Sequence, residues 1–155
     1  MGGYAYFQGQ IVPNSEAKIS IQTHAFLYGT GVFEGIRAYW VEEEQQLYVF
    51  RMLEHYQRIR NSGRIFMMQA PLSPEEMGQV TLDLLRKNQF KTDVYLRPIL
   101  YKNGTAVGIK CHEMSEDFLI FAVPFGAYLD TEKGQRVKVS SWRHLEDNMI
   151  PMRAK

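Results

Sequence analysis

Three side chains that could bind an anion alternate along one segment of this sequence. Tyr95, Arg97 and Tyr101 lie within residues 94–101, which are rich in strand-forming residues. In a strand these side chains would share one face, because successive side chains point to opposite sides. A guanidinium flanked by two phenols can hold a carboxylate through paired hydrogen bonds. The residues alone leave a second interpretation equally open, in which Arg97 forms a structural ion pair with an acidic neighbour.

A glycine-rich segment, residues 29–35, invites comparison with phosphate-binding loops. It differs from the dinucleotide-binding motif because the third glycine is misplaced and a strand, not a helix, is expected to follow. It also lacks the Gly-Lys-Ser/Thr ending of a Walker loop. Spacing alone therefore favours a structural turn.

The remaining candidate groups indicate no metal site. Cys111, His112 and Glu113 are adjacent, and three adjacent residues of a regular element cannot all point at one ion. His24 and His55 lie in apolar or amphipathic segments, which favours a structural role for both histidines.

Composition limits the classes of function. The chain has 155 residues, 45% of them hydrophobic, which suits one packed domain. Its net charge of +1 gives no reason to expect nucleic acid or an anionic membrane as the main partner. No apolar run approaches the roughly 20 residues of a membrane helix. With a single cysteine and no signal-peptide pattern at the N-terminus, the expected location is the cytoplasm.

The patterning predicts two helices among many short strands. Residues 53–61 have apolar positions at helical spacing, and Gly63 is expected to end that helix. A second helix begins after Ser73, where Glu76 completes a capping box. Gly9 is expected in a hairpin turn. Strands are predicted at residues 4–7, 11–12, 32–33, 36–40, 47–50, 94–101, 118–123 and 137–141.

Two parts joined by a linker are expected. Residues 124–136 contain proline, glycine and charged residues and are predicted to be an interdomain linker. The mixture of strands and helices in residues 1–123 indicates an α/β or α+β class. Residues 137–155 would begin a second domain, because their apolar content differs from that of an ordinary polar terminus.

Five segments, in this order and spacing, together resemble the fold-type-IV aminotransferases and specifically the branched-chain amino-acid aminotransferases. They are YGTGVFEGIR (28–37), EHYQR (54–58), YLRP (95–98), FGAY (125–128) and the stretch from SSW to IPMRAK (140–155). The resemblance covers nearly the whole chain. It implies a small N-terminal mixed α/β domain, followed by the first strand of a larger pseudo-barrel domain that stops at the cofactor lysine.

The resemblance also implies a cofactor, pyridoxal 5′-phosphate, and two residues that hold it. Lys155 matches the catalytic lysine that carries the cofactor as a Schiff base and moves the proton at the substrate Cα. Arg58 matches the arginine that grips the cofactor phosphate, for which its planar fork is suited. The cofactor itself would serve as the electron sink.

Substrate recognition is implied for Tyr28, Phe33, Tyr95, Arg97 and Tyr128. Phe33 and the rings of Tyr28 and Tyr128 would form an apolar wall. Arg97, held by the Tyr28 hydroxyl, would meet the second carboxylate of glutamate, and the Tyr95 hydroxyl would reach the α-carboxylate. The implied reaction converts L-leucine, L-isoleucine or L-valine and 2-oxoglutarate into branched-chain 2-oxo acids and L-glutamate.

Other functions remain open at this stage. A D-amino-acid aminotransferase or an aminodeoxychorismate lyase would share the fold, and Phe125 stands where many bacterial branched-chain enzymes have tryptophan. A non-catalytic interaction module is a rival of a different class. The implied partners are amino acids, 2-oxo acids and at least one further copy of the chain, because the family builds its sites at a dimer interface.

Overall fold

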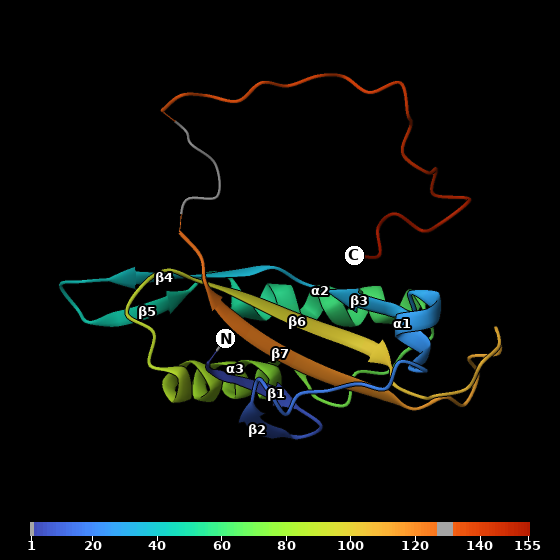
Figure 1. Ribbon diagram of the computed structural model, residues 1–155, viewed down its shortest axis with the longest axis horizontal. Helices are drawn as coiled ribbons and strands as arrows, with labels where there is room; N and C mark the ends of the chain where they lie inside the picture. Colours follow the sequence, from blue (N-terminus) through green and yellow to red (C-terminus); the bar gives the residue numbers. More distant parts are fainter. Residues whose placement is uncertain (1, 127–131) are drawn as a thin grey trace.

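The computed structural model describes residues 2–126 and 132–155, and Figure 1 shows an antiparallel sheet with two long helices. The helices are α1 (His24–Tyr28), α2 (Met52–Ile65) and α3 (Pro74–Asn88). The strands are β1 (Tyr4–Phe7), β2 (Gln10–Pro13), β3 (Gly31–Phe33), β4 (Ile36–Val41), β5 (Gln46–Val49), β6 (Val94–Lys102) and β7 (Glu116–Pro124).

The strands form one sheet in the order β2-β1-β7-β6-β4-β5, with β3 also paired to β6. Every pair among the described strands is antiparallel. The predicted mixed class is therefore confirmed in its α+β form, because an α/β fold is built on parallel strands. The strands predicted between residues 4 and 123 are all present, with small differences at their ends.

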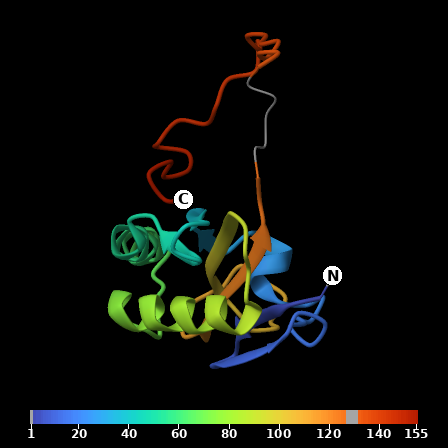
Figure 2. The same ribbon diagram turned by 90° about the vertical axis from the view of Figure 1, so that its left-hand side faces the viewer.

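Helices α2 and α3 cover one face of this sheet (Figure 2). The core joins Tyr56 and Ile59 of α2 and Leu84 of α3 to alternate residues of the strands, such as Leu96 and Ile120. Alternation sends the intervening strand residues to the opposite face. One face of the sheet thus holds the hydrophobic core, and the other is left for side chains that do not pack under the helices.

Two local predictions are confirmed. The Ser73 hydroxyl accepts a hydrogen bond from the Glu76 amide (3.2 Å), and the Glu76 carboxylate accepts one from the Ser73 amide (2.7 Å). This capping box begins α3 and contributes about 1 kcal/mol. Gln8 and Gly9 form the two-residue turn between β1 and β2 with φ of 49° and 80°, as a type I′ turn requires.

The predicted end of α2 is wrong. The helix continues through Gly63 to Ile65, and Gly63 is buried within it. A Cβ atom at this position would lie 2.6 Å from the Leu100 side chain. The glycine therefore allows α2 to approach β6 closely. Spacing within the helix cannot distinguish this role from that of a helix stop.

Pro98 of β6 interrupts the hydrogen bonding between β6 and its neighbour, which is therefore divided into β3 and β4. The pairing keeps one register from Phe33↔Ile99 to Ile36↔Leu96, which places Glu34 opposite Pro98. The Glu34 amide donates to the Pro98 carbonyl (3.0 Å), but proline has no N–H with which to return the second bond of an antiparallel pair. The ladder breaks there, so β3 and β4 are separate strands at the point where the candidate site lies.

The strand predicted at residues 137–141 is absent. These residues have no regular secondary structure, and Val137 and Val139 are almost fully exposed. A strand needs a hydrogen-bonding neighbour, and none of the described residues supplies one to this segment. Residues 132–155 instead run in a long arc that brings the C-terminus beside α2 and β3 (Figures 1 and 2). The predicted linker overlaps residues 127–131, which lie outside the described chain, and the domain boundary remains a prediction.

Candidate active site

A buried carboxylate, that of Glu34, joins basic side chains from distant parts of the chain. Its Oε1 accepts a hydrogen bond from Arg58 Nε and its Oε2 accepts one from Arg58 Nη2, both at 2.5 Å. Oε2 also lies 2.9 Å from His55 Nδ1 and 3.6 Å from Lys155 Nζ. The Glu34 side chain is 0% exposed, whereas those of Arg58 and Lys155 are 51% and 43% exposed. Two cations on one carboxylate leave the exposed side of the cluster positively charged.

The elements explain why these groups meet. His55 and Arg58 are three residues apart on α2 and so share one face of the helix. Alternation along β3 and β4 turns Val32, Glu34 and Ile36 towards the helices. Glu34 therefore faces the polar positions of α2, at the edge of a core that is otherwise apolar.

Lys155 reaches the cluster through its own backbone. Its carbonyl accepts a hydrogen bond from the Phe33 amide (2.8 Å), and its amide donates to the Ser62 hydroxyl (3.2 Å). The first bond uses the edge of β3 that faces away from β6. The second attaches the C-terminus to α2. Lys155 is thus fixed between the strand and the helix that supply Glu34 and Arg58.

The basic neighbours keep Glu34 ionised despite its burial. Burial raises the pKa of this carboxyl, but hydrogen bonds from Arg58 and His55, with the charges of Arg58 and Lys155, outweigh it and hold the pKa below the ordinary 4.5. The bond to Glu34 in turn raises the pKa of Arg58. The pair is therefore fully charged at neutral pH.

A second cluster lies on the opposite face of the sheet. Arg97 Nη2 donates to the Tyr95 hydroxyl (2.8 Å), and its guanidinium lies 4.3 Å from the centre of the Phe33 ring. Arg97 Nε is buried without a hydrogen-bond partner among the described residues. Phe33 and Glu34 are adjacent in the chain, so the Glu34 cluster and the Arg97 cluster lie back to back on the two faces of the sheet. The second cluster presents a cation on an aromatic wall, which suits a ligand with both a carboxylate and an apolar side chain.

Residues 31–155 match the family model for amino-transferase class IV. The chain belongs to this family.

Known members of this family align with almost the whole of this chain. A probable branched-chain-amino-acid aminotransferase of Aquifex aeolicus is 49% identical over 98% of this chain and 49% of its own length. The crystal structure of the branched-chain aminotransferase of Thermoproteus uzoniensis with norvaline superposes with a TM-score of 0.91 at 36% identity, covering 97% of this chain and 50% of that one. The branched-chain amino acid aminotransferase of T.th., complexed with N-(5′-phosphopyridoxyl)-L-glutamate, gives 0.86 at 36% identity, covering 97% and 49%. The chain spans about half the length of the relatives it matches.

One predicted substrate residue, Tyr28, has different partners from those expected, and so does Tyr101 of the anion-binding face. The Tyr28 hydroxyl accepts a hydrogen bond from the Gly108 amide (2.8 Å), whereas Arg97 donates to the Tyr95 hydroxyl and not to that of Tyr28. Tyr28 lies at the end of α1, an element that patterning did not predict, and the left-handed Gly29 directs the chain away there. Tyr101, on the same strand as Arg97, bonds Asp117 instead (3.1 Å). Tyr128 lies outside the described residues.

The two histidines have different surroundings. His24 is buried and bonds the Thr30 hydroxyl (2.8 Å) and the Gly108 carbonyl (3.0 Å), as a structural histidine does. His55 belongs to the Glu34 cluster. Among the residues that the structure describes, no group of acidic, histidine or cysteine side chains is arranged to hold a metal ion. No helix in the same residues is both long and apolar enough to cross a membrane.

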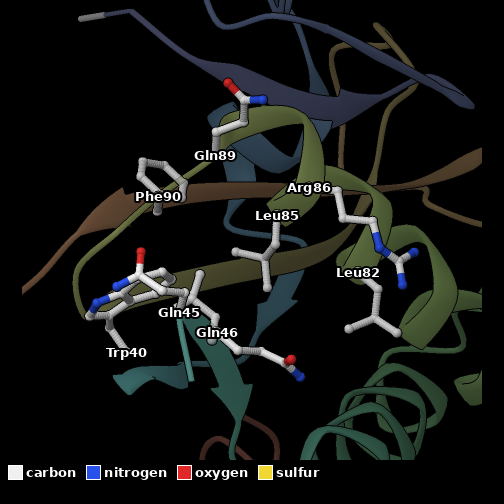
Figure 3. Close-up of a pocket in the computed structure, with 9 residues that line it drawn as sticks. Trp40, Gln45, Gln46, Leu82, Leu85, Arg86, Gln89 and Phe90 are labelled. Atoms are coloured by element: carbon white, nitrogen blue, oxygen red, sulfur yellow. The ribbon is translucent and has the colours of Figure 1, made fainter. Parts of the chain in front are cut away.

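A cavity of about 380 Å³ lies away from both clusters, between the β4–β5 hairpin and the end of α3 (Figure 3). Trp40 and Phe90 line it with glutamine and leucine side chains. Its charged group, Arg86, is paired with Asp83 (2.8 Å). The cavity holds no nucleophile or carboxylate and none of the predicted site residues, so it is not the candidate active site.

Glu34 is not among the site residues predicted from the sequence. One signal is present in the sequence: the carboxylate of Glu34 lies in the apolar run from Val32 to Ile36, between the strands predicted at residues 32–33 and 36–40. A charged residue on the core side of a strand requires a partner, because an unpaired buried charge is costly. The sequence could therefore have indicated a buried ion pair, but not that Arg58 and Lys155 would share it.

Proposed function

We propose that this class IV aminotransferase transfers the amino group of L-leucine, L-isoleucine or L-valine to 2-oxoglutarate, with pyridoxal 5′-phosphate as cofactor. The products would be branched-chain 2-oxo acids and L-glutamate. The observation that carries the proposal is the meeting of Lys155 and Arg58 at the carboxylate of Glu34. The names of the relatives support the substrate class, and the phosphopyridoxyl-glutamate adduct bound by the T.th. enzyme supports the second half-reaction.

The donor set fits this cofactor. Arg58 uses its Nε and Nη2 edge on Glu34, and Nη2 also lies 3.4 Å from His55 Nδ1, so the Nη1 donors are left for a phosphate on its exposed side. Lys155 offers a primary amine beside it, half exposed and held at its backbone. The positive charge of the cluster complements a phosphate dianion.

Lys155 would have two tasks. Its amine would hold the cofactor carbonyl, and it would carry the proton that leaves the substrate Cα. The cofactor, when bound, supplies the electron sink that stabilises the negative charge developed at Cα. The backbone bonds from Phe33 and to Ser62 would keep the amine in position for both tasks.

The second cluster would select the substrates. Phe33 would contact the apolar side chain of leucine, isoleucine or valine, and Tyr95 would meet the α-carboxylate. Arg97 would bind the second carboxylate of glutamate or 2-oxoglutarate, because its buried Nε has a donor to offer. Tyr128 is included on the resemblance alone, and Tyr28 would act from the side of the Gly108 loop.

Assembly as a homodimer or larger oligomer, in the cytoplasm, is part of the proposal. Phe26, Val107 and Ile109 are 65%, 76% and 89% exposed, and large exposed apolar side chains favour a covered surface. Sedimentation velocity of the purified protein measures the oligomeric state directly, and a monomer at micromolar concentration would contradict the proposed assembly.

Absorption spectroscopy followed by product analysis tests the function. The full-length protein, incubated with pyridoxal 5′-phosphate, should show a visible band that disappears on addition of L-leucine. Adding 2-oxoglutarate should restore the band and yield L-glutamate. Lys155→Ala should show neither change, while Lys138→Ala, at an exposed position, should behave like the wild type.

Other outcomes would identify the rivals. Turnover of D-alanine in place of L-leucine would indicate a D-amino-acid aminotransferase, and pyruvate release from aminodeoxychorismate would indicate a lyase. A protein that never acquires the band would be a non-catalytic module.

A further inference from the structure

The carboxylate of Glu34 is held more tightly than a simple surface ion pair would be. Its side chain is fully buried, and its backbone amide is bonded to Pro98 of the central strand. Both of its oxygens accept from Arg58, and Oε2 also contacts His55. This gives Arg58, which is half exposed, a rigid partner on its buried side.

We propose that Glu34 is a positioning residue for phosphate recognition: it fixes the guanidinium plane of Arg58 so that the remaining donors point at the cofactor phosphate. The inference rests on the proposed function, in which Arg58 holds that phosphate. Glu34 itself would not touch the phosphate, because the guanidinium covers its carboxylate.

The fork geometry supports this role. A guanidinium has five N–H donors in one plane, and a carboxylate bound through Nε and one Nη fixes the direction of the other donors. An arginine without such a partner samples many rotamers, and ordering it would reduce the affinity for the ligand. Glu34 therefore imposes that order before the ligand arrives.

A role for Glu34 as the counter-ion of Lys155 is less well supported by the distances. The Lys155 Nζ atom is 3.6 Å from Oε2, longer than a hydrogen bond, whereas both contacts with Arg58 are 2.5 Å. The stronger and directional interaction is with Arg58.

The test compares two ligands that differ only in the phosphate. Dissociation constants for pyridoxal 5′-phosphate and for pyridoxal are measured on the full-length protein, on Glu34→Gln and on Glu34→Asp. Glu34→Gln removes the charge and one acceptor; Glu34→Asp keeps the charge but withdraws it from Arg58 by one methylene. Thermal unfolding identifies which variants are folded.

If Glu34 positions Arg58, its replacement should weaken the binding of pyridoxal 5′-phosphate and not that of pyridoxal. The affinity for pyridoxal 5′-phosphate should fall about tenfold to a hundredfold in either variant, the range for losing a hydrogen bond to a charged group, while that for pyridoxal changes little. Glu116→Gln is the matched control, because it removes the carboxylate partner of the buried Lys102 (2.6 Å) at the far end of β6. It should alter stability and leave the ratio of the two affinities unchanged.

The outcomes separate this inference from the proposed function. If a folded Glu34 variant keeps the wild-type ratio, or weakens both ligands equally, Glu34 is a structural residue and the inference is wrong. If the wild type itself does not distinguish the two ligands, Arg58 does not hold a phosphate, and the proposed function fails with the inference.

Discussion

Lys155 Nζ lies 3.6 Å from the Oε2 atom of Glu34, although the two residues are far apart in the sequence. The strand edge at Phe33 and the Ser62 hydroxyl of α2 hold the lysine backbone in place. The contact therefore depends on an arc of chain returning to the sheet, where the lysine meets the carboxylate that also binds Arg58.

Replacement of Lys155 by alanine should abolish transamination. Loss of proton transfer alone lowers the rate about 10²- to 10⁴-fold, and loss of the attached cofactor lowers it further. Single-turnover rates with L-leucine, measured with saturating pyridoxal 5′-phosphate, provide the test. An Lys155→Ala protein with a rate near that of Lys138→Ala would exclude a catalytic role for this amine.

Arg97→Ala should affect the dicarboxylic substrates more than the branched-chain ones. Its guanidinium stacks on Phe33 and bonds Tyr95, which directs it towards the apolar wall. Losing a charged hydrogen bond should raise KM for 2-oxoglutarate about tenfold to a hundredfold. KM for L-leucine should change much less. Equal losses for both substrates would refute the assignment, and Arg86→Ala on the exposed side of α3 serves as a control.

Gly35→Ala should disturb the same cluster indirectly. A Cβ atom at this position would overlap the Tyr95 hydroxyl and lie 3.0 Å from its Cζ. The ring must move, which weakens its bond with Arg97 and costs about 1–3 kcal/mol of stability through overpacking. KM for 2-oxoglutarate should rise with Gly35→Ala but not with Gly126→Ala, where a Cβ atom would have no described residue within 4 Å. Unchanged kinetics in Gly35→Ala would mean that Tyr95 does not support Arg97 during turnover.

Glu34 should make the protein sensitive to acid. Its pKa in the folded state lies below the ordinary 4.5, because bonds from Arg58 and His55 outweigh its burial. The ionised group therefore stabilises the folded state above pH 4.5, and that contribution is lost as the pH falls through the lower, folded-state value. Free energies of unfolding in urea, measured from pH 7 to pH 3, should decline more steeply for the wild type than for Glu34→Gln. Parallel curves would show that Glu34 does not contribute to the acid transition.

Much of the fold follows from short stretches of sequence. The capping box at Ser73 and Glu76 and the turn at Gln8–Gly9 depend on residues within one turn of each other. The alternation of Tyr95 and Arg97 depends on the geometry of a single strand. Lys155 and Arg58 are indicated by the resemblance of their surrounding segments, and the structure brings both side chains to one carboxylate.

The tertiary structure alone decided the rest. Position 63, within α2, is occupied by glycine because Leu100, from a distant strand, leaves no room for a Cβ atom. Tyr28 bonds Gly108 because α1 and its left-handed Gly29 direct it there. Residues 137–141 have the composition of a strand but no neighbour with which to pair among the described residues. Glu34 likewise becomes a site residue only because Arg58 and Lys155, from distant segments, reach its carboxylate. Local patterns specify which conformation a segment favours, whereas the pairing of charges and the closeness of packing depend on which segments meet, and that is decided only when the whole core forms.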